Sequence, residues 1–389
     1  MRVLFFNYEF PPLGGGAGNA SYYLLEEFTK IPDLQVDLVT SSVDDEQHVL
    51  QMGDNIRIYR IPIRKDPGNM HYQSLTELLR YRKRAYKFAK NLIKNNEYDL
   101  THSFFSVPCG HISYKLWKKY KIPYIISLRG ADVPGYSERF SLLYGFIVPT
   151  IKKIWRNAYF VIANSQGLRE LALKSAPDKE IGVICNGINV GDFFPNYEKR
   201  DLSYFTIVCV SRITPRKGIR FLIQAFKVLS ARYSNIRMLI VGDGNEKPSL
   251  EQLTLGLGLE DKVVFTGAVP HKDVLQYYHK ANVFVLPSLN EGMSNTMLEA
   301  LACGLPLIAT DTGGTKEILA DGRNGFIVRM RDSNDLAEKL EKLVLDPSLV
   351  ERMGQESLRI AKELSWESVA KGYVELYQKT INLRKIRNH

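Results

Sequence analysis

The sequence predicts an α/β protein built from two doubly wound parallel sheets. Short apolar runs alternate with amphipathic helical patterns along the first half of the chain, and a second alternation of the same kind begins near residue 204. Glycine-rich turns follow several of the apolar runs, as they do where a strand leads into a helix. The chain has 389 residues, which is enough for two domains that each bury a core of their own.

This alternation divides the chain into four expected parts. They are an N-terminal domain over residues 1–190, a linker over 191–203, a second domain over 204–365 and a C-terminal helix over 366–389. The linker is expected because turn-forming residues are followed there by alternating charges. Ligands of open α/β sheets bind at the carboxyl ends of the strands. Two such domains would therefore place their binding edges across one cleft.

The individual elements follow from periodicity and from turn signals. The strands expected in the first domain are Val3–Asn7, Val36–Thr40, Ile56–Ile61, Leu100–Ser103, Tyr124–Ser127, Tyr159–Ala163 and Gly182–Cys185, with helices at Ala20–Thr29 and Tyr72–Asn95. The strands expected in the second domain are Thr206–Val210, Arg237–Val241, Val263–Thr266, Val283–Leu286, Leu307–Thr310 and Gly325–Val328. Its helices are expected at Ile219–Arg232, Lys247–Leu257, His271–His279, Ser294–Cys303, Thr315–Ala320 and Asp335–Leu345.

Composition narrows the class of protein. The apolar (45%) and charged (24%) fractions are those of a globular protein, and no apolar run approaches the length of a spanning helix. The four cysteines lack metal-ligand spacing and are expected as free thiols in a reducing cytosol. The net charge of +10 is concentrated between residues 57 and 156, where 20 Lys and Arg face 6 Asp and Glu. Such an asymmetry predicts an anionic partner, either nucleic acid or a lipid surface.

Two carboxylates bracket an expected helix start in the second domain. Glu291 lies in the loop after the strand Val283–Leu286, and Glu299 lies about a turn and a half inside the helix that Ser294 or Asn295 caps. The free N–H groups of a helix N-terminus suit a phosphate, and carboxylates suit sugar hydroxyls. The stretch therefore favours a ligand with a phosphate in the middle and hydroxyls at both ends, as in a nucleotide sugar.

Cations and glycines add to this hypothesis. Arg212 and Lys217 follow a strand end at a spacing that lets two cations neutralise a diphosphate. No D-x-D triplet occurs in the chain, so we expect no metal and neutralisation by protein cations and helix dipoles. In the first domain a loop containing Gly15 and Gly16 lets the backbone approach a ligand closely, although it fits the dinucleotide fingerprint poorly.

These residues resemble the retaining GT-B glycosyltransferases of family 4, whose fold is two Rossmann-like domains facing a cleft. The motifs that carry the resemblance in the second domain are Glu291 with Glu299, Ser211-Arg212-Ile213 with Lys217-Gly218, Val241-Gly242-Asp243-Gly244, Phe265-Thr266-Gly267, and Gly304-Leu305-Pro306 to Gly313-Gly314 and Glu317. Looser matches in the first domain are Pro12 to Gly18, Arg129-Gly130-Ala131-Asp132, Asn164-Ser165 and Asn186-Gly187. The last helix resembles the family's C-terminal helix, which packs back on the N-terminal domain.

The resemblance implies a function. The N-terminal domain would take the acceptor and the second domain a UDP- or GDP-sugar, whose sugar is transferred to a glycan or a lipid-linked acceptor with retention and without a cofactor. Glu291 would hold sugar hydroxyls and Glu299 the ribose. The other implied donor contacts are Gly15, Gly16, Arg212, Lys217, Gly242, Gly292, Met293, Ser294, Asn295 and Thr296. Arg129 stands where many relatives carry His, and it is grouped with Asp132, Glu291, Arg212 and Lys217 as catalytic candidates. Arg129 cannot act as a base, but it could hold an anionic sugar or an acceptor phosphate.

The sequence leaves three other functions open: a sugar-nucleotide epimerase of the same fold, a non-catalytic nucleotide-sugar-binding subunit, and a nucleic-acid-binding protein. Aromatic residues interleave with the basic ones in the helix over 72–95, but Tyr81 and Phe88 fall near helical spacing and are expected to face the core. We therefore expect no nucleic-acid partner. The basic region instead predicts a cytoplasmic protein that docks on the inner face of the plasma membrane, with Trp117 and Trp155 at the headgroup level.

Overall fold

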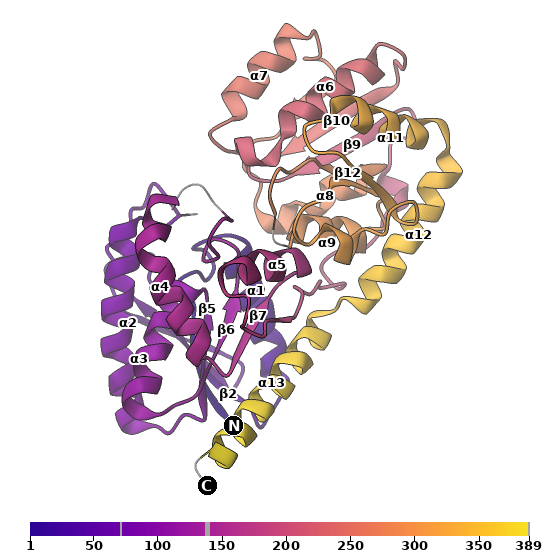
Figure 1. The fold of residues 1–389 in the computed structure, drawn as a ribbon. Coiled ribbons are helices and arrows are strands. Elements are labelled where there is room, and N and C mark those ends of the chain that lie inside the picture. Colours follow the sequence, from indigo (N-terminus) through magenta and orange to yellow (C-terminus); the bar gives the residue numbers. More distant parts are fainter. Residues whose placement is uncertain (71, 137–140, 292, 388–389) are drawn as a thin grey trace. The chain divides into compact units, whose positions relative to one another are not determined.

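The computed structural model describes residues 1–70, 72–136, 141–291 and 293–387 (Figure 1). Two compact units divide the chain. Unit 1 consists of Met1–Gly187 and Trp366–His389, and unit 2 of Ile188–Ser365. The segment 191–203, expected as a linker, lies in unit 2, where Phe193 is buried. Each unit is an α/β structure around its own sheet, so the predicted fold class is confirmed.

The sheet of unit 1 has the strand order β3-β4-β2-β1-β5-β6-β7-β8. Its strands are β1 (Arg2–Phe6), β2 (Gln35–Ser41), β3 (His48–Met52), β4 (Ile56–Ile61), β5 (Leu100–Phe104), β6 (Tyr124–Leu128), β7 (Phe160–Ala163) and β8 (Gly182–Val183). All pair in parallel except β3, an antiparallel edge strand that periodicity did not predict. The chain order reverses between β1 and β5, so their carboxyl ends flank the topological switch point where such sheets bind ligands.

The helices of unit 1 are α1 (Gly16–Thr29), α2 (Leu75–Asn95), α3 (His111–Tyr120), α4 (Ser141–Asn157), α5 (Gln166–Ser175) and α13 (Trp366–Arg387). Helix α2 begins at Leu75 rather than at Tyr72, because Ser74 and Glu77 form a reciprocal capping box at its start. Helix α13 follows unit 2 in the chain and packs against α1, burying Trp366, Tyr373 and Tyr377 in the core of unit 1.

The sheet of unit 2 has the order β11-β10-β9-β12-β13-β14, which is the Rossmann order 3-2-1-4-5-6. Its strands are β9 (Phe205–Val210), β10 (Ile236–Val241), β11 (Val263–Phe265), β12 (Val283–Leu286), β13 (Leu307–Thr310) and β14 (Gly325–Val328), all paired in parallel. Its α-helices are α6 (Ile219–Ser230), α7 (Lys247–Gly256), α8 (Leu275–His279), α9 (Asn295–Ala302), α10 (Thr315–Ile318), α11 (Ser333–Leu345) and α12 (Pro347–Glu363). The switch point lies between β9 and β12.

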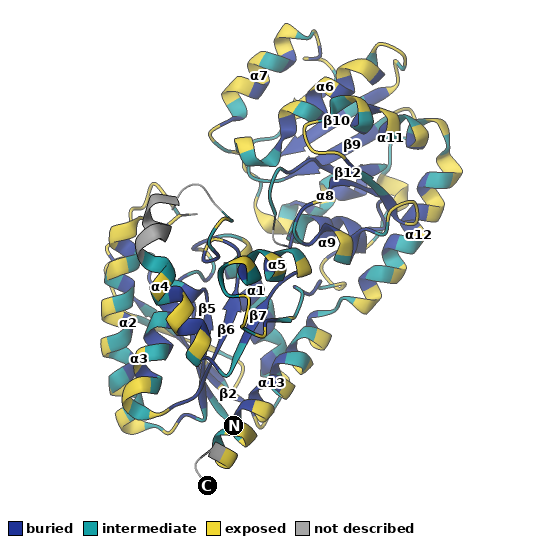
Figure 2. Cartoon of the chain, in the orientation of Figure 1, coloured by how far each residue is buried: buried dark blue, intermediate teal, exposed yellow. Residues whose placement is uncertain are grey.

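Most cations of the basic region of unit 1 lie on α2, α3 and α4, which are neighbours on one face of the sheet (Figures 1 and 2). Tyr81 is fully buried, and Phe88 packs partly buried against the core, as expected. The prediction for Trp155 is wrong. Its ring is fully buried and its Nε1–H donates to Ser106 Oγ at 2.7 Å, because the helical face that carries it is turned to the sheet. None of the helices in the described part of the chain is long and apolar enough to cross a bilayer.

Candidate active site

Two loops at the switch point of unit 2 are tied together by their backbones. One follows β9 and runs through the short turn Pro215–Lys217, and the other follows β12. Leu289 N–H donates to the carbonyl of Arg216 at 2.8 Å. Gly218 adopts a positive φ of 64°, and a Cβ there would lie 2.2 Å from the carbonyl oxygen of Pro287. The glycine therefore permits the close approach that brings the two loops together.

Lys217 and Glu291 meet across these loops. The Lys217 ammonium forms a hydrogen-bonded ion pair with Glu291 Oε1, and Ser288 Oγ donates to the same oxygen at 3.0 Å. Both charged side chains are largely buried. Burial alone would raise the pKa of Glu291, but the charge and hydrogen bond of Lys217 outweigh it and lower the pKa below its ordinary value. An anion and a cation thus lie side by side at the edge where this sheet type binds ligands.

Glu299 is held from two sides on helix α9. Ser294 caps this helix by accepting a hydrogen bond from Met297 N–H at 3.4 Å, so Glu299 lies one turn inside it and is buried. Tyr278 O–H donates to Glu299 Oε2 at 2.7 Å, and His271 Nε2 lies 3.0 Å from Oε1. Each carboxylate oxygen accepts one such contact and keeps capacity for another, so the group can still accept hydroxyl hydrogens.

The remaining predicted donor residues of unit 2 line the same edge. Arg212 follows β9 and is partly buried, and Gly242 directly follows β10. A Cβ on Gly242 would lie 2.0 Å from the carbonyl oxygen of Ser211, which keeps the Arg212 loop close to β10. Met293, Asn295 and Thr296 lie at the start of α9. Gly292 lies outside the described residues.

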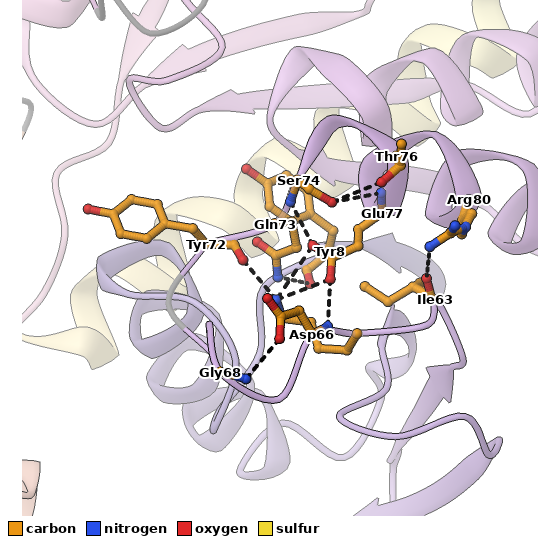
Figure 3. A network of polar contacts seen from close by, with 11 residues as sticks. Tyr8, Ile63, Asp66, Gly68, Tyr72, Gln73, Ser74, Thr76, Glu77 and Arg80 are labelled. Carbon is orange, nitrogen blue, oxygen red and sulfur yellow. Dashed lines mark hydrogen bonds and ion pairs between the residues drawn. The ribbon is translucent and has the colours of Figure 1, made fainter.

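In unit 1 the predicted glycines stand at the start of α1. Gly16 is its first residue, and Gly15 is its N-cap, with no side chain to satisfy the first N–H groups. Gly14 N–H donates to the carbonyl of Met70 at 3.0 Å, so the loop after β4 holds the glycine loop. A buried ion pair anchors that second loop (Figure 3). Glu77 accepts from Lys65 Nζ at 3.3 Å and from the backbone N–H groups of Asp66 and Ser74 at 2.9 and 2.6 Å.

Arg129 and Asp132 follow β6 in unit 1. Asp132 is buried and accepts hydrogen bonds from Arg129 N–H at 2.9 Å and from the N–H and hydroxyl of Ser106 at 2.7 and 2.8 Å. It therefore ties the loop after β5 to the loop after β6. Burial raises the pKa of Asp132 in spite of these hydrogen bonds. The Arg129 guanidinium donates to Asn186 Oδ1 at 2.7 Å and to Tyr373 Oη at 3.3 Å.

Sequence reasoning missed the partners of the predicted residues. Tyr278 and His271 come from other elements, and only the three-dimensional fold brings them to Glu299. Ser288 was not predicted as a site residue, although its spacing from Glu291 could have marked it as a side-chain donor. Within the described ranges, no group of three or more His, Cys, Asp or Glu side chains is arranged to hold a metal ion.

Comparison with known proteins agrees with this architecture. Residues 192–359 match the family described as glycosyl transferases group 1, and residues 14–192 match glycosyltransferase family 4. A lipopolysaccharide core biosynthesis glycosyltransferase of Rhizobium meliloti is 30% identical over 63% of this chain and 71% of its own length. An uncharacterised glycosyltransferase of Methanocaldococcus jannaschii is 26% identical over 97% of this chain and 98% of its own.

Among solved structures, sucrose-phosphate synthase of Thermosynechococcus elongatus superimposes with a TM-score of 0.86 at 23% identity, over 98% of this chain and 100% of the other. The fold, with two parallel-sheet α/β units, is therefore that of the GT-B class of glycosyltransferases. The chain belongs to the group 1 glycosyltransferases of family 4. It is an enzyme that transfers glycosyl groups, which sets aside the epimerase and the non-catalytic subunit.

Proposed function

We propose that the protein transfers a sugar from a UDP- or GDP-sugar to a glycan or lipid-linked acceptor, with retention of anomeric configuration and without a metal ion. The observation that carries the proposal is the ion pair of Lys217 and Glu291 at the switch point of unit 2. A donor that enters there meets a cation for its diphosphate and a carboxylate for its sugar hydroxyls on adjacent loops.

The proposed roles follow from this placement. Arg212 and Lys217 neutralise the diphosphate. Arg212 does so through the paired N–H donors of its planar guanidinium, and Lys217 through the compact charge of its ammonium group. Glu299 accepts from the ribose hydroxyls, held in place by Tyr278 and His271. In the reaction the bond between the anomeric carbon and the phosphate oxygen breaks, and the acceptor oxygen bonds to the same face. The departing phosphate takes the acceptor's proton, so no protein base is required.

A screen of nucleotide sugars identifies the donor and tests this proposal. UDP- and GDP-sugars are compared by the shift in melting temperature, since a ligand at 100 times its dissociation constant stabilises a protein by about 2.7 kcal/mol. The selected donor is then turned over in EDTA, and proton NMR gives the anomeric configuration of the product. We expect retention and activity in EDTA. An inverted anomer would contradict the mechanism, and loss of activity that Mg²⁺ restores would contradict its independence of metal.

We further propose that unit 1 docks on an anionic membrane. Exposed cations on α2, α3 and α4 form what we call the basic face, consisting of Lys83, Arg84, Lys87, Lys94, Lys115, Lys118, Lys119, Lys152, Lys153 and Arg156. In place of Trp155, three exposed apolar side chains stand just before α2 and in its first two turns: Tyr72, Leu75 and Leu79, which are 37, 46 and 45% exposed. Each cation near anionic lipid contributes about 1 kcal/mol, so four to six would hold the protein reversibly. Docking would bring the enzyme to a lipid-linked acceptor. The same proposal includes a cytoplasmic location, on the inner face of the membrane.

Co-sedimentation with liposomes tests the docking. We expect the protein to pellet with vesicles of acidic lipid at low salt and to be released at high salt. Replacing Lys83, Arg84 and Lys87 by Gln should weaken binding, whereas the matched change of Lys199, Lys280 and Lys362, exposed cations of unit 2, should not. Protein that stays in the supernatant at low salt would overturn the membrane proposal and leave the transferase proposal intact.

A further inference from the structure

The guanidinium of Arg129 carries a charge that no carboxylate contacts directly within the described ranges. Its two hydrogen-bond acceptors, Asn186 Oδ1 and Tyr373 Oη, are neutral. A guanidinium has five N–H donors, so three remain without an acceptor among these residues. One of them, Nε–H, is fully buried. A cation taken this far out of water ordinarily has an anionic partner.

The nearby carboxylate of Asp132 is already occupied. Its Oδ1 accepts from the backbone of Arg129, and its Oδ2 accepts two hydrogen bonds from Ser106. Asp132 attracts the guanidinium through space but forms no ion pair with it, so the N–H groups of Arg129 stay available. The partner of this charge is therefore missing from the described part of unit 1.

A rigid frame holds the guanidinium in one position. It lies over the ring of Phe104, 3.4 Å from the centroid. Tyr373 Oη, which accepts from Arg129, also lies 2.9 Å from Ser127 Oγ, and His102 bridges Ser127 and Tyr377 at 2.8 Å each. Burial and the charge of Arg129 lower the pKa of His102 well below its ordinary value, so this ring is neutral and does not compete for an anion. The guanidinium N–H groups of Arg129 are therefore held in one orientation without a bound ligand.

Arg129 lies at the kind of sheet edge where open α/β sheets bind their ligands. Arg129 follows β6, the neighbour of β5, whose carboxyl end flanks the switch point of unit 1. Gly130 follows with a φ of 109°, and a Cβ there would lie 2.7 Å from the ring of Tyr136. The turn that follows Arg129 therefore requires a glycine at position 130.

We propose that Arg129 binds an oxyanion of a substrate, a carboxylate or a phosphate, carried either by the donor sugar or by the acceptor. This inference rests on the proposed function and deepens it, because it makes one of the two substrates anionic beyond the diphosphate. The planar fork of an arginine matches the two oxygens of such a group and discriminates against a neutral hydroxymethyl in its place.

The test follows the side chain itself in the full-length protein. The Nε–Hε NMR signal of Arg129 in ¹⁵N-arginine-labelled protein, assigned by its loss in Arg129→Gln, is titrated with inorganic phosphate, with glucuronate and with neutral glucose. We expect a saturable shift with one or both anions and none with glucose. Comparing UDP-glucuronate with UDP-glucose asks whether the donor carries the anion. Titrating phosphate in the presence of UDP asks whether the acceptor site does.

The variants separate this inference from the proposed function. Calorimetric titration with the anions does not depend on the Arg129 signal and compares the variants. Arg129→Gln should weaken anion binding by about 10- to 150-fold and Arg129→Lys should weaken it less, whereas Arg57→Gln, which replaces an exposed arginine on β4, should not change it. UDP and GDP affinity, measured by calorimetry, should be unchanged in all three. The anion site would be overturned if neither anion shifted the signal, or if Arg129→Gln bound the anions as tightly as the wild type does. Anion binding without any nucleotide binding would support the anion site and contradict the proposed donor.

Discussion

Tyr278 donates a hydrogen bond of 2.7 Å to the carboxylate of Glu299, and both side chains are buried. Burial and the neighbouring carboxylate raise the pKa of Tyr278 well above its ordinary value, so the phenol stays a donor at every physiological pH. The Glu299 carboxylate, which we propose as the ribose ligand, is therefore held in orientation by a phenol that stays protonated. This relationship gives the site its first testable consequence.

Tyr278→Phe should weaken nucleotide binding. The substitution removes one hydrogen bond to a charged group, worth about 1.5–3 kcal/mol, and lets Glu299 leave its orientation. We expect a roughly tenfold rise in the dissociation constant of UDP or GDP, measured by calorimetry. Tyr277→Phe, a change of the preceding residue of α8, serves as the control and should bind as the wild type does. Unchanged binding by Tyr278→Phe would show that this hydrogen bond does not shape the site.

His271 should titrate above its ordinary pKa. The hydrogen bond to Glu299 is the largest cause, and the partial burial of the ring opposes it. A raised pKa means that the ion pair stabilises the fold fully below the unfolded value and that the contribution is lost as the pH rises through the folded value. NMR titration of the ring should show the elevation in the wild type and its loss in Glu299→Gln. An equal pKa in both proteins would contradict the contact.

Lys217→Ala should impair turnover of the donor. Removing a preorganised electrostatic group commonly costs about 2.7–4 kcal/mol of transition-state stabilisation, or a hundredfold or more in kcat. The turnover is measured as the rate at which nucleoside diphosphate is released from the donor. Lys227→Ala, an exposed lysine on α6, is the control. Glu291 also loses its cation in Lys217→Ala, so its pKa should rise, and the stability it contributes above its ordinary pKa should shrink.

Gly242→Ala should destabilise unit 2 and disturb the Arg212 loop. The new Cβ would lie 2.0 Å from the carbonyl oxygen of Ser211, at a φ of 135° that L side chains rarely adopt. Strain and overpacking together should lower the free energy of unfolding by about 2 kcal/mol or more. Gly256→Ala, where nothing lies within 4 Å of the new Cβ, should leave stability unchanged or slightly raised. Chemical denaturation compares the two, and equal stability would contradict the close approach.

Local patterns predicted the two sheets and the position of helix α9. The strand Val283–Leu286, the cap Ser294 and the stop at Gly304 carry their own signals, because apolar runs, capping oxygens and glycines act within a few residues. The edge strand β3 was missed, because His48–Met52 is mostly exposed and lacks an apolar face. Helix α12 was also missed, although Asp346 at its N-cap and Pro347 after it are a start signal.

Long-range contacts lay beyond the sequence. The burial of Trp155 depends on Ser106, which follows β5 and is far away in the chain. In the same way, the contacts of His271 and Tyr278 with Glu299 depend on how the turn His271–Asp273 and helix α8 pack against α9. The roles of Glu291, Glu299, Arg212 and Lys217 stay predictions, and their placement at one sheet edge is what the structure adds.

Calorimetric titration of UDP and GDP into the intact chain in EDTA tests whether unit 2 binds a nucleotide donor without a metal ion. We expect one of the two nucleotides to bind without a metal ion. We also expect that Glu299→Gln weakens this binding by about 10- to 150-fold, because a charge-assisted hydrogen bond to the ribose is lost, while Glu291→Gln mainly lowers turnover. Binding by Glu299→Gln equal to that of the wild type would contradict the proposed role of Glu299, and binding that requires added Mg²⁺ would contradict the proposed independence of metal.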